Sequence, residues 1–410
     1  MIINGLPRLV FAGLSSVQTM LCNRNSSSVT RSKFSWKDKS VRSSANHTNF
    51  LRQLSVGNII DFCANSSSVA NNDEQITNTT SFAINGFGRI GKCVLRLAIQ
   101  NDMNVVAINE PSVNISAIAN SFKYDTVHGM FPGVVDIKGD SLDINGKIIR
   151  VYTEKNPEKI KWKELPVNYV IDSTGSFTEV SKAKKHIEAG VKKVIISAPS
   201  KDAPMLVKGV NFDQYRKTMS VVSNASCTTN CAAPLIHIIN NTFGVEYCLL
   251  TTVHAMTSSQ NVLDTVKQRS ASGNIVHSTT GAAKAVGIVI PELKGKVTGD
   301  SVRVPTLDVS LLKLYLIVKN PVKLVAIKCA IWKDATQNND TVISYIDDTE
   351  KLVSTDFVGS QCSAIVDFSQ VSVIGDKFVT IGAWYDNEMG YSSRLLDLYT
   401  HMVKMDSDNI

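Results

Sequence analysis

Cys227 lies in a segment rich in hydroxyl and amide side chains, which reads Ser-Asn-Ala-Ser-Cys-Thr-Thr-Asn-Cys at residues 223–231. Apolar residues at 235–239 follow on one helical face, so the polar segment is typical of a helix start. Unpaired backbone N–H groups and the positive end of the helix dipole favour a thiolate there. With the hydroxyls of Ser226 and Thr228 beside it, Cys227 is a candidate nucleophile. The alternative is a buried thiol without chemistry.

Residues 82–85 predict a strand, residues 86–91 read Gly-Phe-Gly-Arg-Ile-Gly, and a helical pattern follows. This strand–turn–helix context is the one that a dinucleotide-binding turn requires. Gly86 permits the tight turn, Gly88 lets a pyrophosphate approach the backbone, and Gly91 lets helix and strand pack closely. A second predicted strand, over residues 105–108, leads to Glu110, where an acid binds the ribose hydroxyls of NAD. A glycine turn of purely structural use is the alternative.

Further strands and helices alternate along the chain. Predicted strands over residues 169–172 and 193–197 flank a predicted helix over 181–189, which indicates a parallel sheet wound on both sides. After His254, residues 258–278 predict a long loop, and strands over 363–367 and 378–383 predict a mixed or antiparallel sheet. The expected fold class is therefore α/β, with a doubly wound (Rossmann) dinucleotide-binding domain plus an α+β catalytic domain with a mixed sheet.

Composition favours a globular protein, because hydrophobic residues make up 43% of the 410 residues and charged residues 19%. No apolar run reaches the roughly 18 residues of a membrane span, so we expect no membrane association. The net charge of +7 comes partly from the basic first seventy residues, so it says little about nucleic acid, and we expect none to be required. The eight cysteines form no pattern with zinc spacing, so we expect no metal.

Residues 1–80 are basic, rich in Ser and Asn and without sustained periodicity. That composition resembles an organelle transit peptide, and a disordered tail is the alternative. A transit peptide would place the protein in a plastid or mitochondrion, and a plain tail would leave it in the cytoplasm.

With the dinucleotide turn, Cys227, His254, Arg303 and Asn387 in this order, residues from about 81 to 405 resemble the phosphorylating glyceraldehyde-3-phosphate dehydrogenase family. The resemblance is long and specific. It is carried by residues 84–91, 123–125, 128–129, 194–199, 223–231, 252–255, 280–287 and 385–388.

The resemblance implies NAD-dependent oxidation of D-glyceraldehyde 3-phosphate to 1,3-bisphosphoglycerate, in glycolysis or gluconeogenesis. Cys227 is expected to attack the aldehyde and form a thiohemiacetal, while His254 accepts the hydroxyl proton. Inorganic phosphate then releases the resulting thioester as an acyl phosphate. Arg303, whose guanidinium suits bidentate contact with phosphate, is expected to bind the substrate phosphate together with Thr257.

The remaining expected contacts fall into two sets. The inorganic phosphate site is expected to comprise Ser226, Thr228, Thr280 and Gly281, although each hydroxyl could instead serve as a helix cap. The expected cofactor contacts are Gly86, Phe87, Gly88, Arg89, Ile90, Glu110, Lys155, Thr174, Ser197, Asn387 and Tyr391.

The chain also departs from the family pattern. Glu110 stands where an Asp is usual, so either NAD or NADP preference is open, with NAD expected. Residues 258–278 are shorter than the family's loop, which packs between subunits, so the homotetramer implied by the resemblance rests on a shortened loop. His277 and Leu307 replace prolines, and Lys313 replaces an acid.

Two alternatives to the expected reaction stay open. One is an erythrose-4-phosphate dehydrogenase, and the other is a catalytically weak paralogue that binds RNA or protein.

The expected domain boundaries are an extension over 1–80, an NAD-binding domain over 81–226 joined by the C-terminal helix 387–410, and a catalytic domain over 227–386.

Overall fold

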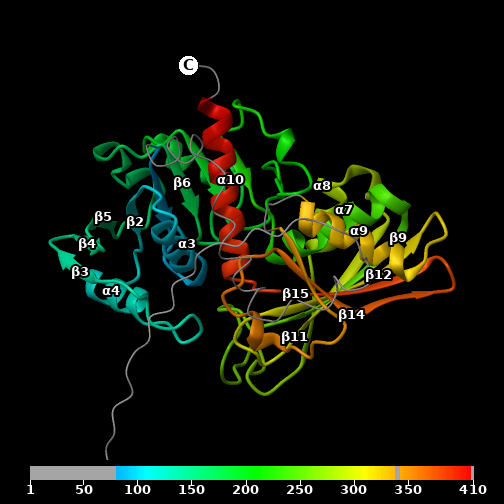
Figure 1. Cartoon of the computed structure of the whole chain (residues 1–410). Helices are drawn as coiled ribbons and strands as arrows, with labels where there is room; N and C mark the ends of the chain where they lie inside the picture. The colour runs from blue at the N-terminus through cyan, green and yellow to red at the C-terminus, as the bar shows by residue number, and fades with distance from the viewer. Residues whose placement is uncertain (1–79, 338–341, 408–410) are drawn as a thin grey trace, which may run out of the picture. The chain divides into compact units, whose positions relative to one another are not determined.

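The computed structural model describes residues 80–337 and 342–407 (Figure 1). The interpretation of residues 1–80 as an extension therefore concerns a segment that, except for Thr80, lies outside the described residues. No helix among the described residues is both long and apolar enough to span a bilayer.

The first sheet has eight strands in the order β3-β4-β5-β2-β1-β6-β7-β8, and it is parallel from β5 to β8. The chain winds outward from β1 in both directions, so the carboxyl end of β1 lies at the point where a doubly wound sheet binds its ligand. The strands are β1 (Phe82–Asn85), β2 (Val105–Asn109), β3 (Val135–Lys138), β4 (Ser141–Ile144), β5 (Lys147–Tyr152), β6 (Tyr169–Asp172), β7 (Lys193–Ile196) and β8 (Val221–Ser223).

The second sheet has seven strands in the order β10-β11-β9-β12-β15-β14-β13 and mixes parallel with antiparallel pairs. Its strands are β9 (Val245–His254), β10 (Val276–Thr279), β11 (Val297–Arg303), β12 (Ser310–Val318), β13 (Ile343–Ile346), β14 (Ala364–Ile374) and β15 (Phe378–Tyr385). The two sheets confirm the predicted fold class.

Helices complete both cores. Those of the described residues are α3 (Arg89–Gln100), α4 (Ile115–Lys123), α5 (Val180–Ala183), α6 (Lys185–Glu188), α7 (Cys227–Phe243), α8 (Ala282–Val289), α9 (Leu324–Gln337) and α10 (Met389–Ser407), with short 3-10 turns at Pro157–Lys159, Trp162–Glu164, Phe212–Gln214, Pro291–Leu293 and Ser354–Phe357.

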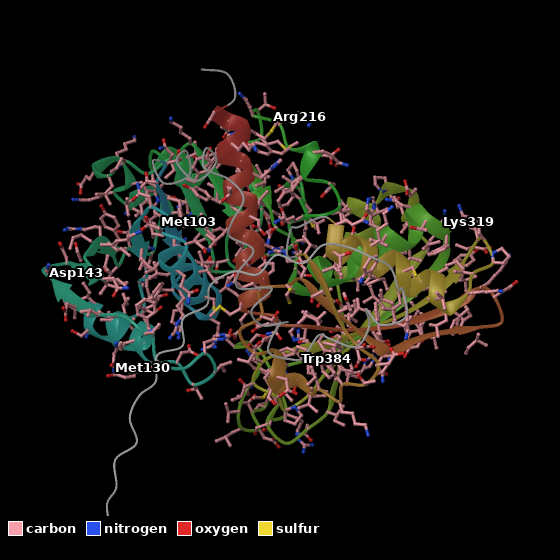
Figure 2. The ribbon with its side chains drawn as sticks, in the orientation of Figure 1. Met103, Met130, Asp143, Arg216, Lys319 and Trp384 are labelled. Atoms are coloured by element: carbon pink, nitrogen blue, oxygen red, sulfur yellow. The ribbon has the colours of Figure 1, made fainter. Side chains whose placement is uncertain are left out.

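The helix α10 follows the last strand of the second sheet but packs in the core of the first. Figure 1 shows it running alongside α3, and its Tyr399 ring lies 4.6 Å from the Phe82 ring of β1. Leu395 and Met402 are fully buried in the same core. Helices α7, α8 and α9 instead share a core with the second sheet, and Figure 2 shows side chains filling the space between these layers.

Two sequence predictions need correction. The helix expected over 181–189 is divided into α5 and α6, with Lys184 between them at φ −59° and ψ −20°, so the interruption is a small change in winding. The loop expected over 258–278 ends earlier, because residues 276–279 form β10 against β11. Four residues are too few for alternation to reveal a strand in the sequence.

Candidate active site

Cys227 is the first residue of α7, as predicted. Its neighbour Ser226 caps the helix, with the Oγ accepting the Thr229 N–H at 3.1 Å. Ala225, just before the cap, has φ +54°, a left-handed conformation that is uncommon outside glycine. The Tyr391 hydroxyl donates to the Ala225 carbonyl at 2.9 Å and holds this turn. The strained turn therefore fixes the position from which the sulfur projects.

The register of two parallel strands brings His254 and Arg303 together. The strands β9 and β11 pair so that Arg303 lies directly opposite His254 at their carboxyl ends. His254 Nε2 lies 3.5 Å from Cys227 Sγ, and Arg303 Nη1 lies 2.5 Å from His254 Nδ1. One imidazole thus contacts the thiol on one side and the guanidinium on the other.

The Arg303 contact favours one histidine tautomer. A guanidinium has only donors, so Nδ1 accepts from Arg303 and the imidazole proton resides on Nε2, facing the sulfur. Nδ1 also lies 2.7 Å from the Ala255 carbonyl, which could accept a proton from it. Withdrawal of Arg303 would therefore let Nδ1 donate to Ala255 and leave a lone pair on Nε2 beside the sulfur.

Burial and charge favour the neutral forms of Cys227 and His254. Although part of Cys227 remains accessible, protein atoms crowd the sulfur and raise the pKa of the thiol, an effect that Thr228 and Arg303 only partly offset. Burial and the Arg303 charge lower the pKa of His254 to about 4. The direction for Cys227 is opposite to the one expected from the helix start alone, because desolvation of the sulfur outweighs the favourable N–H groups.

The hydroxyl residues expected at the phosphate sites have local partners. Thr228 Oγ1 lies 2.9 Å from the buried Tyr385 hydroxyl, which also lies 2.7 Å from Thr252 Oγ1. Thr280 Oγ1 accepts the Ala282 N–H at 3.2 Å at the start of α8, and Gly281 is the N-cap residue of that helix. Thr257 Oγ1 lies 3.1 Å from Ser259 Oγ.

The glycine turn forms at the carboxyl end of β1. Gly86 has φ +89°, and a Cβ there would lie 2.8 Å from Thr174 Cγ2, so no other residue fits. A Cβ on Gly88 would meet no atom within 4 Å, which leaves room beside the backbone at the start of α3. The helix has no side-chain cap there, and its free N–H groups suit a pyrophosphate.

Glu110 lies beside this turn, where its Oε2 accepts the Phe87 N–H at 3.0 Å. Burial raises its pKa, but the bonds from Phe87 and Ser112 outweigh that effect and hold the pKa below the usual range. An ionised Glu110 fits the ribose hydroxyls of a dinucleotide. These residues therefore fit the predicted cofactor.

The other predicted cofactor residues differ in their surroundings. The Arg89 guanidinium is engaged by Glu388 and Asp125, so Arg89 and Ile90 can reach a cofactor through the backbone of α3. Asn387 is buried and accepts from Ser310 Oγ at 2.7 Å. Ser197 directly follows β7, with its N–H bonded to the Asp172 carbonyl, whereas Lys155 is exposed after β5.

Sequence reasoning missed Ser310. Its Oγ accepts the Ala255 N–H at 3.1 Å and donates to Asn387 Oδ1, so it links the residue beside His254 to a predicted nicotinamide contact. The apolar alternation that continues along β12 was the available signal, because Ser310 occupies an inward position of that strand.

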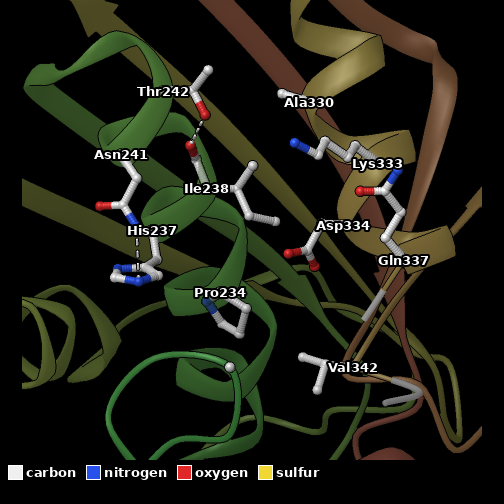
Figure 3. Close-up of a pocket in the computed structure, with 11 residues that line it drawn as sticks. Pro234, His237, Ile238, Asn241, Thr242, Ala330, Lys333, Asp334, Gln337 and Val342 are labelled. Atoms are coloured by element: carbon white, nitrogen blue, oxygen red, sulfur yellow. Dashed lines mark hydrogen bonds between the residues drawn. The ribbon is translucent and has the colours of Figure 1, made fainter. Parts of the chain in front are cut away.

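A hollow of about 450 Å³ lies between α7 and α9, away from this site, and none of the predicted site residues lines it (Figure 3).

The fold and these side chains define a two-domain protein that joins a dinucleotide-binding turn to a cysteine–histidine pair. Family models agree: residues 80–180 match "Glyceraldehyde 3-phosphate dehydrogenase, NAD binding domain", and residues 226–387 match the C-terminal domain of the same family. The chain belongs to the glyceraldehyde-3-phosphate dehydrogenase family.

Curated relatives are similar over nearly their full length. A glyceraldehyde-3-phosphate dehydrogenase of Phytophthora infestans is 51% identical over 331 residues, which are 78% of this chain and 98% of the relative. One of Ogataea parapolymorpha is 48% identical over 80% of this chain and 99% of the relative. A cytosolic one of Gracilaria gracilis is 47% identical over 78% and 98%.

Replacing Ser310 by Ala is expected to lower the free energy of unfolding by about 1–3 kcal/mol, because the buried Ala255 N–H and Asn387 Oδ1 lose their partner. Urea titration measures the change. Ser372→Ala is the matched control, since that hydroxyl bonds Thr380 at the exposed surface. Equal stability of the two variants would contradict a structural link through Ser310.

Proposed function

We propose that this protein catalyses the NAD-dependent phosphorylating oxidation of D-glyceraldehyde 3-phosphate to 1,3-bisphosphoglycerate. The observation that carries the proposal is the contact of Cys227 Sγ with His254 Nε2 at 3.5 Å, with Arg303 bound to the other side of the imidazole. The name of the relatives, glyceraldehyde-3-phosphate dehydrogenase, and the match to the NAD-binding domain of that family support it.

Binding of an anion by Arg303 prepares the pair for reaction. A substrate phosphate competes for the guanidinium and draws it from His254 Nδ1, after which Nδ1 donates to the Ala255 carbonyl. Nε2 then carries the lone pair that a base needs. Binding of the substrate phosphate thus produces the His254 tautomer that can accept the Cys227 proton.

Cys227 then attacks the aldehyde carbon, forming a C–S bond, and His254 passes the proton taken from Cys227 to the aldehyde oxygen, which becomes the hydroxyl of a thiohemiacetal. His254, neutral again, accepts the proton of this hydroxyl as the thiohemiacetal is oxidised to a thioester. NAD, when bound, supplies the hydride acceptor. Inorganic phosphate attacks the thioester carbonyl, and the C–S bond breaks to release the acyl phosphate and free Cys227. The site of the inorganic phosphate is proposed to be lined by Ser226, Thr228, Thr280 and Gly281.

The cofactor is proposed to lie against Gly86, Gly88 and the first turn of α3, with Glu110 at the ribose. The other proposed cofactor contacts are Phe87, Arg89, Ile90, Lys155, Thr174, Ser197, Asn387 and Tyr391. At the substrate phosphate, Thr257 is proposed to bind together with Arg303.

The domain division is proposed at residues 226 and 387. It is supported by the strand ranges of the two sheets and by the packing of α10 beside α3.

We also propose that the chain assembles as a homotetramer. Four apolar residues of the shortened loop are more than two thirds exposed, namely Val262, Leu263, Val266 and Ile275. Exposed apolar side chains that lie together are typical of a surface that binds another protein, here a second subunit. Light scattering of the purified chain measures the assembly.

Delivery to a plastid or mitochondrion is proposed on the composition of residues 1–80 alone, with the cytoplasm as the alternative.

Turnover that depends on phosphate tests the proposed reaction. Purified full-length protein with NAD and glyceraldehyde 3-phosphate is expected to form NADH continuously only when phosphate is present. A single burst of NADH would show that the thioester forms but phosphate fails to reach it. Absence of any NADH from folded protein that binds NAD would contradict the proposal.

A further inference from the structure

A buried chain of hydrogen bonds links the carboxyl ends of β1, β2 and β6, next to the glycine turn. Its centre is Asp172, the last residue of β6, which is 1% exposed. The strand register sets Asp172 beside Asn85, the last residue of β1, whose amide donates to Asp172 Oδ2 at 2.7 Å. Asn109, the last residue of β2, donates in turn to Asn85 Oδ1 at 2.8 Å. The polar chain therefore joins three strand ends at the edge of the sheet where a dinucleotide binds.

His186 is the second donor to Asp172 Oδ2. Its ring is fully buried, and the Trp162 Nε1–H donates to His186 Nδ1 at 3.2 Å. An indole only donates, so Nδ1 accepts and the imidazole proton lies on Nε2, 3.1 Å from Asp172 Oδ2. The Asn85 amide lies 3.2 Å from the same nitrogen, but two accepting ring nitrogens would require an imidazolate. Oδ2 therefore accepts from both Asn85 and His186.

The other carboxylate oxygen of Asp172 holds Thr174, one of the expected cofactor contacts. Oδ1 accepts the Thr174 N–H at 3.1 Å and the Thr174 Oγ1–H at 2.7 Å. Thr174 Oγ1 also accepts the Ser176 N–H at 3.1 Å, so this hydroxyl is engaged within the protein. The methyl group of Thr174 faces Gly86, where a Cβ would lie 2.8 Å from Cγ2. Asp172 thus fixes the side chain against which the glycine turn packs.

Ser173, between Asp172 and Thr174, has hydrogen-bonding capacity left for a ligand. Its N–H donates to the Asn85 carbonyl at 2.7 Å, whereas its buried Oγ has no hydrogen-bond partner within the part of the chain that the structure describes. A buried hydroxyl without a partner is unfavourable unless a ligand or a water satisfies it. The strand end that Asp172 holds is therefore suited to contact with a polar molecule.

We propose that Asp172 is a positioning residue for the dinucleotide, an inference that rests on the NAD site proposed above. The buried side chains of His186 and Asn85 hold its carboxylate, and the carboxylate holds residues 173–175 against the glycine turn. Because these contacts exist before NAD binds, little ordering of the site is needed on binding, and that favours affinity.

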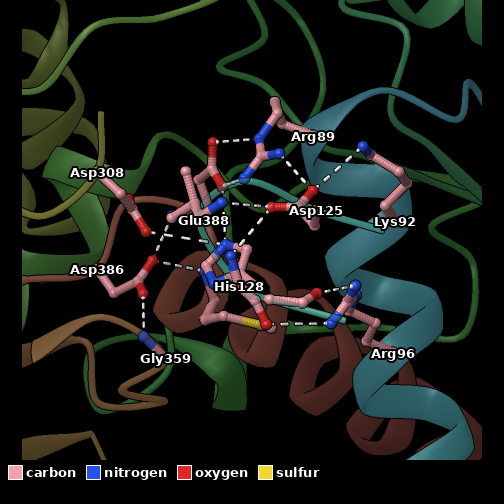
Figure 4. A network of polar contacts seen from close by, with 12 residues as sticks. Arg89, Lys92, Arg96, Asp125, His128, Asp308, Gly359, Asp386 and Glu388 are labelled. Carbon is pink, nitrogen blue, oxygen red and sulfur yellow. Dashed lines mark hydrogen bonds and ion pairs between the residues drawn. The ribbon is translucent and has the colours of Figure 1, made fainter. Parts of the chain in front are cut away.

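The turn is also anchored at its other end. Arg89, the first residue of α3 and three residues beyond Gly86, pairs with Glu388 and Asp125 (Figure 4). The glycine turn is thus held from Asp172 on one side and from Arg89 on the other. Loss of the Asp172 contacts would leave the Arg89 ion pairs intact, so the turn would loosen without the fold being lost.

The test measures NAD binding to the full-length protein by calorimetry, which does not depend on turnover. Asp172→Asn places an amide N–H₂ where Oδ2 accepts, so that donors face donors. We expect the Kd for NAD to rise by about 10-fold or more, at a temperature where circular dichroism shows the variant to be folded. The KM for NAD is expected to rise with it, whereas the KM for glyceraldehyde 3-phosphate stays within about twofold.

Asp367→Asn is the matched control. Asp367 is also buried, and its Oδ1 accepts both the N–H and the Oγ–H of Ser369, two residues further on. It repeats the Asp172 motif on β14 of the second sheet, so its substitution affects stability and is expected to leave the Kd for NAD within about twofold. Equal rises of the Kd in the two variants would overturn the proposal.

Other outcomes would overturn it as well. A folded Asp172→Asn protein that binds NAD as tightly as the unmodified protein would reduce Asp172 to a role in stability. If Asp172→Asn does not fold, Thr174→Val decides, because it keeps the shape of the side chain and lacks the hydroxyl that Asp172 orients. We expect its Kd to rise about fivefold, as for one lost hydrogen bond, and an unchanged Kd would overturn the proposal. An unmodified protein that binds no NAD would overturn the proposed function too.

Discussion

Cys227→Ser is expected to reduce phosphate-dependent NADH formation by on the order of 10⁴-fold or more, the range seen when a nucleophile is removed from a unit that acts together. A serine hydroxyl in the same place would be far harder to deprotonate than the thiol, and His254 alone cannot activate it while its own pKa is held near 4. The absorbance of NADH under saturating phosphate measures the loss.

The matched control for this substitution is Cys329→Ser, which makes the same change at an exposed cysteine of α9. Its turnover is expected to stay within about twofold of the unmodified protein, since exposed changes away from a site have small effects. A Cys227→Ser protein that kept a tenth of its turnover would show that the sulfur is not the nucleophile.

Arg303→Met is expected to lower kcat/KM by about 10²–10³-fold, because two charge-assisted hydrogen bonds to a phosphate are worth roughly 1.5–3 kcal/mol each and partial compensation remains. The exposed Arg216→Met is the control, since within the part of the chain that the structure describes this side chain bonds carbonyl oxygens of its own turn. Similar losses in both variants would contradict a phosphate role for Arg303.

The same variant has a distinctive pH dependence. The neutral imidazole is the form that accepts a proton, so activity falls as pH drops through the pKa of His254, which is about 4 with Arg303 present. Removing that positive charge, 2.5 Å away, raises the pKa of His254 toward its ordinary value. Burial, the larger cause of the lowering, remains in the variant, so we expect Arg303→Met to lose activity at a higher pH than the unmodified protein does, within the interval between about pH 6.5 and pH 4. An unchanged profile would rule out the proposed coupling.

The lowered pKa of His254 also makes the stability of the fold depend on pH. Because the pKa of His254 is lowered in the folded state, its contribution to stability is fully present above about pH 6.5 and is lost as pH falls toward 4. The unfolded chain binds more protons in that window. This loss should be smaller in Arg303→Met, and acid unfolding followed by circular dichroism compares the two proteins.

Local patterns were enough to predict the elements that start each half of the site. The strand–glycine turn–helix at β1 and α3 and the polar start of α7 were predicted from adjacent residues, because they depend on local backbone rules. The strand β10 was missed, since four residues show too little alternation to distinguish a strand from a loop.

Long-range arrangement accounts for what the sequence alone could not predict. The pairing of Arg303 with His254 depends on β9 and β11 being parallel neighbours, which chain order does not reveal. The raised pKa of Cys227 depends on how many atoms surround the sulfur, and no periodicity encodes that. Ser310 needed both kinds of information, since its two partners come from Ala255 and Asn387.

The position of α10 has a consequence for how the protein is made. Tyr399 of α10 leaves the ribosome after both sheets have been synthesised, yet its ring packs against Phe82 of β1 and Tyr169 of β6. Until α10 has been synthesised, the nascent dinucleotide-binding layer keeps an open apolar surface. Folding of this layer is therefore expected to wait for α10, with chaperones shielding the earlier strands in the interval.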